Sequence, residues 1–285
     1  MPHPLFSESA PEAAANLRNS GRRRFLAGAG WLGSLAAGWR FLGLGTDQLA
    51  CAASPSGEEE SKVNPASGLA GIKQLLAAKD PIAWVFTGDS ITHGALHTFG
   101  WRSYPEHFAE RVRWELRRVR DIVINTGISG DRTGGLLADI EWRVLHLKPH
   151  VVSVMLGMND CAAGPDGREQ FRKNMGEIVT RIQGAGAIPL LNTPNTVYVK
   201  NSAGRTDLPA YAAIVREVAQ ARNVALVDHW AHWEKSKPDQ EALLPWIEDK
   251  SIHPGVYGHR EFAKLIFREL GIYDPDSLTC KLEVP

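Results

Sequence analysis

The stretch from Ile82 to His93 constrains the fold most, because it joins a short apolar run to the tripeptide Gly-Asp-Ser. The run is too short for a typical helix and predicts a buried parallel strand that ends just before Ser90. The glycine ahead of the turn lets the backbone bend sharply. Open α/β sheets bind their ligands beyond the carboxyl ends of the strands, so Ser90 is a candidate nucleophile. The alternative is an ordinary loop after a strand.

The rest of the chain alternates between apolar runs and amphipathic segments whose apolar residues recur three and four apart. Strands joined by helices need crossover connections, so we expect a parallel sheet with helices on both faces, a three-layer α/β/α sandwich. The predicted further strands are 122–124, 151–156, 187–191 and 224–227, and the predicted helices are 104–119, 133–147, 169–183, 208–222 and 256–270.

Residues 1–52 have the layout of an export signal, and 53–68 that of a linker. Paired arginines precede Phe25-Leu26, and a Gly/Ala-rich run follows, which favours the twin-arginine route. The segment 53–68 is rich in Ser, Pro, Gly and Glu and has too few large apolar residues to fold. We therefore expect a domain over 69–285 that is exported to the periplasm or the extracellular space.

Two other interpretations of the amino-terminal segment remain open besides cleavage near Ala52. Arg40 interrupts the apolar run and leaves it shorter than the roughly 20 residues of a membrane span, so we expect no stable membrane insertion after cleavage. Lipid attachment at Cys51 would place Gln48 where an aliphatic residue is usual.

Charge and cysteine content narrow the function classes. The chain has 32 basic and 32 acidic residues and no basic stripe with interleaved aromatics, so nucleic acid is not an expected partner. Outside the signal, Cys161 and Cys280 could pair in an oxidising compartment, but the sequence does not give their distance.

Two further strands are followed by polar, glycine-containing loops. Gly130 lies in Ser-Gly-Asp-Arg-Thr just before a predicted helix, where backbone amides are unpaired and the helix dipole is positive. Asn159 follows the third strand in Gly-Met-Asn-Asp. The amides of Ser90 and Gly130 and the side chain of Asn159 are therefore candidates to hold a developing oxyanion. Ordinary strand-to-helix loops and an Asx turn are the structural alternatives.

His253 is the best-placed base among ten histidines, because it lies in a loop that opens the last predicted helix. A serine hydroxyl is a weak nucleophile until a base takes its proton, and histidine titrates near neutral pH. His93 and His97 are four residues apart, but the glutamate of the zinc-protease pattern is missing. We expect neither a metal nor another cofactor.

The blocks around Ser90, Gly130, Asn159 and His253 resemble the four conserved blocks of the SGNH hydrolases, also called the GDSL esterase/lipase family. The resemblance covers about 82–270 in the family's order. It implies a flavodoxin-like five-stranded parallel sheet and an ester hydrolase that forms an acyl-enzyme. It also implies Ser90 as nucleophile, His253 as base, and the Ser90, Gly130 and Asn159 groups as the oxyanion hole.

One position departs from the family pattern. Members usually carry an aspartate three residues before the histidine, where this chain has Lys250. Asp249 is the expected third catalytic residue if the loop bulges. A backbone carbonyl or a water is the alternative and would leave a Ser-His dyad.

The expected substrate is a small-molecule or carbohydrate ester, and most specifically an acetyl ester of a carbohydrate. His93 and Trp101 are candidate substrate contacts, because polar and aromatic residues follow the nucleophile and no long apolar insertion is present. Asp89, directly before the nucleophile, is the third candidate. Lysophospholipase, thioesterase or arylesterase activity is an alternative. A non-catalytic carbohydrate-binding protein and an O-acyltransferase on the same fold are others. The sequence does not predict the oligomeric state.

Overall fold

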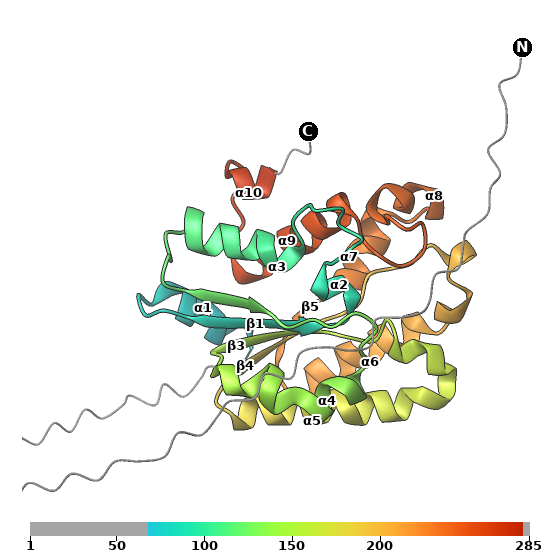
Figure 1. The fold of residues 1–285 in the computed structure, drawn as a ribbon, viewed down its shortest axis with the longest axis horizontal. Coiled ribbons are helices and arrows are strands. Elements are labelled where there is room, and N and C mark those ends of the chain that lie inside the picture. Colours follow the sequence, from blue (N-terminus) through green and yellow to red (C-terminus); the bar gives the residue numbers. More distant parts are fainter. Residues whose placement is uncertain (1–67, 282–285) are drawn as a thin grey trace, which may run out of the picture. The chain divides into compact units, whose positions relative to one another are not determined.

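The computed structural model describes residues 68–281, so the predictions for residues 1–67 lie outside the described residues (Figure 1). In the described part, five strands form one parallel sheet in the order β2-β1-β3-β4-β5. This flavodoxin-like order confirms the predicted fold class. The strands are β1 (Ala83–Gly88), β2 (Ile122–Asn125), β3 (Val151–Met155), β4 (Ile188–Asn192) and β5 (Ala225–Val227), all at predicted positions.

Helices cover both faces of the sheet and complete the three layers (Figure 1). One layer contains α4 (Thr133–Arg143), α5 (Arg168–Gly184) and α6 (Leu208–Ala221). The other contains α1 (Leu69–Ala77), α3 (Tyr104–Ala109), α7 (His229–Ser236) and α9 (Val256–Leu270). Shorter helices are α2 (Ser90–His93), α8 (Gln240–Leu243) and α10 (Leu278–Lys281), and 3₁₀ turns occur at Leu145–Leu147, Asp160–Gly167, Val199–Asn201, Ala203–Arg205 and Leu244–Trp246.

The burial of each strand follows from its position in the sheet. Strands β3 and β4 are buried at every residue, as expected for central strands covered on both faces. Strand β2 lies at an edge and is only partly buried. In the register of β1 with β3, Gly88 pairs with Met155. The nucleophile loop and the Asn159 loop therefore leave the sheet side by side.

The predicted helix over 104–119 is wrong in its second half. Helix α3 continues as a π-helical segment over Glu110–Glu115, and Arg117 then has a φ of 58°. This left-handed conformation ends the helical path, because a side chain with a Cβ rarely continues a helix there. The predicted helix over 133–147 likewise ends at Arg143 and is followed by a 3₁₀ turn.

None of the helices in residues 68–281 has both the length and the apolar character needed to cross a membrane. Cys161 and Cys280 are both buried free thiols, so the pairing considered from the sequence is not formed.

Candidate active site

Ser90 lies at the carboxyl end of β1, as predicted, and is the first residue of α2. The turn requires a glycine, because a Cβ on Gly88 would lie 2.3 Å from the Met155 carbonyl oxygen. Asp89 caps α2 by accepting the Ile91 amide hydrogen at 3.0 Å. The sharp turn and the cap together fix the direction in which Ser90 points.

The hydroxyl of Ser90 meets the imidazole of His253, although 163 residues separate them in the sequence. The distance from Ser90 Oγ to His253 Nε2 is 2.9 Å. His253 lies in the loop just before α9 and is only slightly exposed. A hydroxyl and an imidazole at this distance form the pair in which a histidine can take the proton of a serine nucleophile.

Asp249 contacts the other nitrogen of the same ring. Its Oδ2 lies 2.6 Å from His253 Nδ1, and its Oδ1 accepts the backbone N–H groups of Ser251, Ile252 and His253 at 2.8, 2.9 and 3.0 Å. Lys250 has a φ of 51°, which supplies the bulge that the four-residue spacing requires. The structure therefore brings Asp249, and not a backbone carbonyl, to the ring.

The pKa of Asp249 shows how strongly this carboxylate is held. Burial opposes its ionisation, but the hydrogen bonds from the His253 ring and from the backbone amides outweigh burial and lower the pKa to about 2. Asp249 is therefore ionised throughout the range in which a histidine titrates. An ionised carboxylate on Nδ1 orients the ring and stabilises the imidazolium that forms when Nε2 takes a proton.

Three N–H groups predicted to form an oxyanion hole come from neighbouring loops. The Ser90 amide is in the first turn of α2, where it has no intrahelical acceptor. Gly130 has a φ of 82°, and within residues 68–281 its amide has no hydrogen-bond acceptor. Asn159 donates one Nδ2 hydrogen to the Asp131 carbonyl at 3.0 Å, and its Oδ1 accepts from Arg205 at 3.3 Å. These bonds fix the amide orientation and leave its second hydrogen for a ligand.

Polar and charged side chains behind these loops hold them in place. Arg143 is buried and bonds Asp131 Oδ2 at 2.6 Å and the Thr126 carbonyl at 2.9 Å. Asp160 accepts the backbone amide and the hydroxyl of Thr133 at 3.0 and 2.6 Å. Burial raises the pKa of Asp160 despite these bonds. The Gly130 and Asn159 loops are thus tied to each other and to the start of α4.

The predicted substrate contacts are placed differently from one another. His93 is exposed and its Nδ1 lies 3.0 Å from Ser129 Oγ, and Trp101 is 46% exposed. Asp89 is only 1% exposed and caps α2, so the predicted substrate contact at Asp89 is wrong. Burial raises its pKa to about 7 against the opposing effects of the Ile91 amide and His253. The Asp89 carboxylate caps the helix that begins at the nucleophile and does not face the substrate.

The sequence did not predict the position of His97, whose ring stacks on that of His253. The centroids are 3.6 Å apart and the planes differ by 5°. His97, Asp249 and His253 also bring one ligand-type atom each to within 4.8 Å of one another. Both nitrogens of His253 already contact Ser90 and Asp249, which suits proton transfer better than metal coordination.

Comparison with known proteins confirms the family that the sequence motifs resemble. The sequence model of the GDSL-like lipase/acylhydrolase family matches residues 86–261. The chain belongs to this family. Membership of this family makes the protein an ester hydrolase.

Relatives of this GDSL-like hydrolase include two proteins named as esterases. It is 29% identical over 212 residues to an acetylxylan esterase of Geobacillus stearothermophilus, covering 66% of this chain and 93% of that protein. It is 24% identical over 184 residues to an arylesterase of Vibrio mimicus, covering 64% and 85%.

Solved structures share the fold. A hydrolase from the metagenome of Lake Arreo has a TM-score of 0.59 and 23% identity, covering 69% of this chain and 99% of that one. A variant of the Geobacillus stearothermophilus acetylxylan esterase has a TM-score of 0.57 and 24% identity, covering 70% and 100%.

Proposed function

We propose that this GDSL-like hydrolase cleaves esters through an acyl-enzyme on Ser90. The observation that carries the proposal is the continuous chain from Ser90 Oγ through the His253 ring to Asp249, with contacts of 2.9 and 2.6 Å. In the related acetylxylan esterase, variants that replace a serine, an aspartate or a histidine by alanine are described as catalytic mutants.

The geometry assigns a role to each group. Ser90 Oγ attacks the ester carbonyl carbon while His253 Nε2 takes its proton, and Asp249 stabilises the resulting imidazolium. The carbonyl oxygen becomes an oxyanion that the Ser90 and Gly130 amides and Asn159 Nδ2 bind. His253 returns the proton to the departing alcohol, and Ser90 is left as an ester. Water, activated by His253, then attacks this ester and releases the acid and Ser90.

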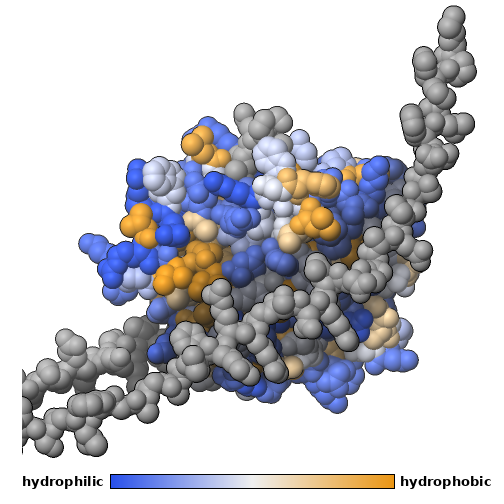
Figure 2. Space-filling model, viewed as in Figure 1, coloured by the Kyte–Doolittle hydropathy of each residue, from blue (hydrophilic) through white to orange (hydrophobic). Residues whose placement is uncertain are grey.

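The proposed substrate is an acetyl ester of a carbohydrate. Its first support is the acetylxylan esterase relative, which matches this chain over 93% of its own length. Its second is the loop after the nucleophile, where Phe99 and Trp101 are 71% and 46% exposed and present aromatic surface near the site. On the face shown in Figure 2, the described hydrophobic residues form separate patches in a mainly hydrophilic surface. Trp230 and Trp233, in contrast, are buried and belong to the core.

The test is an ester series on the purified protein with Ser90→Ala as the control. We expect turnover to be highest with p-nitrophenyl acetate, to fall through the butyrate to the octanoate, and to extend to acetylated xylo-oligosaccharides. Turnover that rises with chain length would refute the acetyl proposal. Hydrolysis in Ser90→Ala equal to that of the wild type would refute the serine mechanism.

Arylesterase activity is the second candidate, because the Vibrio mimicus relative is an arylesterase. It predicts hydrolysis of phenyl acetate without hydrolysis of acetylated oligosaccharides. Product analysis with a free sugar present separates hydrolysis from transfer, since an O-acyltransferase would yield the acylated sugar.

We also propose an exported enzyme. The support is the sequence pattern of residues 1–52 together with 26% identity over 186 residues to an uncharacterized lipoprotein of Bacillus subtilis. Expression of the full chain, followed by fractionation and mass spectrometry of its amino terminus, tests export, and replacement of the paired arginines by lysines tests the twin-arginine route.

A further inference from the structure

We propose that His97 is a positioning residue that clamps the proposed catalytic imidazole of His253 in plane with its two partners. The inference rests on the proposed function, because it assumes that His253 is the base. His97 covers one face of the ring at a centroid distance of 3.6 Å, while the ring edges contact Ser90 and Asp249. A ring held on both edges and on one face has little freedom to rotate about its side-chain bonds.

The loop that carries His97 is folded so as to present it. Thr98 is buried and its hydroxyl donates to the Gly94 carbonyl at 2.8 Å, which closes the loop on itself. Two backbone hydrogen bonds also stabilise the loop. The His97 N–H donates to the Ala95 carbonyl at 2.7 Å, and the Phe99 N–H donates to the Leu96 carbonyl at 3.1 Å. Hydrogen bonds within the loop therefore help to hold His97 in its position.

The residues beside His97 make the same point. Leu96 and Phe99 have φ angles of 63° and 49°, which residues with a side chain rarely adopt. Both are largely exposed, so no packing of their own side chains accounts for these conformations. Strained backbone of this kind concentrates at functional sites, where the strain serves to aim another group. Here that group is His97, the half-buried residue between them.

The charge state of His97 matters because a second cation would oppose protonation of its neighbour. Burial lowers the pKa of His97, the charge of His253 lowers it further, and Asp249 and Glu248 act in the opposite direction. Buried His259 also lies nearby, and its pKa of about 3 keeps it neutral. Near pH 7 His97 is therefore a neutral aromatic plate. In acid it becomes charged and faces the ring that must take the serine proton.

The experiment compares His97→Ala, which removes the plate, with His97→Phe, which keeps an aromatic plate that cannot titrate. Leu96→Ala is the control on the same loop, because it removes an exposed side chain but keeps a Cβ on the left-handed backbone. With p-nitrophenyl acetate, we expect His97→Ala to lower kcat about tenfold at unchanged KM, because a misplaced base lowers turnover rather than binding. We expect His97→Phe to recover most of this loss near neutral pH.

The pH profile supplies a readout that a purely structural role would not change. For the wild type, the acid limb of log kcat should steepen from a slope of about 1 toward about 2 as His97 also takes a proton, whereas His97→Phe should stay near 1. Wild-type kcat in His97→Ala, or a kcat in His97→Phe as low as in His97→Ala, would overturn the proposal. If Ser90→Ala keeps wild-type activity in the same assay, the proposed function fails instead, which separates the two failures.

Discussion

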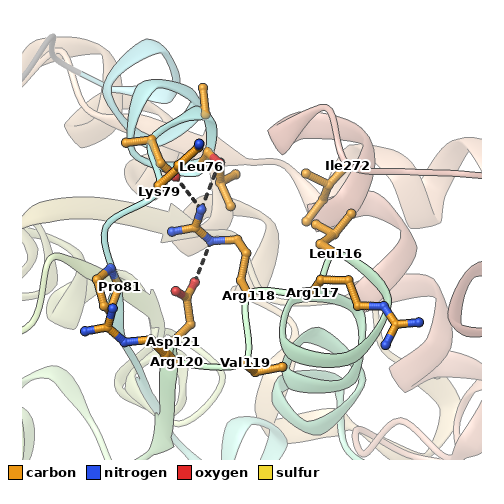
Figure 3. Close-up of a pocket in the computed structure, with 12 residues that line it drawn as sticks. Leu76, Lys79, Pro81, Leu116, Arg117, Arg118, Val119, Arg120, Asp121 and Ile272 are labelled. Atoms are coloured by element: carbon orange, nitrogen blue, oxygen red, sulfur yellow. Dashed lines mark hydrogen bonds and ion pairs between the residues drawn. The ribbon is translucent and has the colours of Figure 1, made fainter.

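The two ends of the sheet, where its strands begin and where they finish, carry similar polar residues. They differ in whether those residues are paired within the chain. At the amino end of the sheet, just before β1 and β2, Arg118 and Asp121 lie beside a cavity of about 510 Å³ (Figure 3). Arg118 donates to Asp121 at 2.9 Å and to the carbonyls of Leu76, Ala78 and Asp80 at 3.1, 2.6 and 2.6 Å. Asp121 also accepts the Ile82 amide and the Trp84 indole, at 3.0 and 3.2 Å. The polar groups of this pair already have partners within the chain.

At the carboxyl end of the sheet, where the strands finish, the three predicted oxyanion donors are left incompletely paired. The Ser90 and Gly130 amides have no acceptor in the described part of the chain, and Asn159 retains one free hydrogen. A hydrogen-bond donor without a partner is costly unless water or a ligand meets it. These unpaired donors distinguish the carboxyl end of the sheet as the candidate active site.

Ser90→Ala has the largest expected effect and directly tests the site at the carboxyl end of the sheet. We expect kcat for p-nitrophenyl acetate to fall by about 10⁶, as for other serine hydrolases that lose the nucleophile. Replacing one hydroxyl leaves packing intact, so the free energy of unfolding should change by roughly 0.5 kcal/mol or less. Steady-state kinetics and thermal unfolding check both. A modest loss of kcat would place the nucleophile elsewhere.

Asp249→Asn comes next and separates two functions of one carboxylate. The Asn Oδ1 can still accept the three backbone amides, whereas its NH₂ group meets His253 Nδ1 with the wrong hydrogen-bonding sense and favours the wrong tautomer. We expect kcat to fall by about 10⁴. Only a mild loss would mean that Ser90 and His253 act as a dyad despite the short contact.

Much of this arrangement could be predicted from residue patterns alone. The apolar runs identified all five strands. Buried parallel strands consist of continuous apolar segments, and the partly buried edge strand β2 is also mainly apolar. Ser90 and His253 could be paired because their loops resemble family blocks, and the bulge at Lys250 was one of two stated alternatives.

The errors share a physical cause. Asp89 was interpreted as a substrate contact because it neighbours the nucleophile, but its carboxylate was needed to cap α2. The stack of His97 on His253 depends on a loop whose shape is set by left-handed residues, and no periodicity encodes that shape. Local sequence thus predicted which groups approach the site better than it predicted how their side chains are oriented.

Asn159→Ala is expected to have a smaller effect, because two backbone donors remain. We expect kcat to fall by about 10² to 10³, with KM for the small ester nearly unchanged, if the amide binds the oxyanion mainly in the transition state. Asn159→Asp is the matched variant, since it keeps the shape but replaces the NH₂ donor with an acceptor. Activity retained in Asn159→Asp would show that this side chain only supports the Asp131 loop.

Arg118→Met tests the amino end of the sheet. It should leave kcat unchanged while the protein is folded. Its expected effect is on stability, because it leaves Asp121, 2% exposed, as a buried charge without its cation. We expect the free energy of unfolding to fall by roughly 3–5 kcal/mol. The double variant Arg118→Met/Asp121→Asn removes that charge and should recover part of the loss, as denaturant titration would show. If kcat fell for either variant while the protein was fully folded, the two ends of the sheet would not act separately. The fully paired Arg118–Asp121 network would then affect the reaction at Ser90.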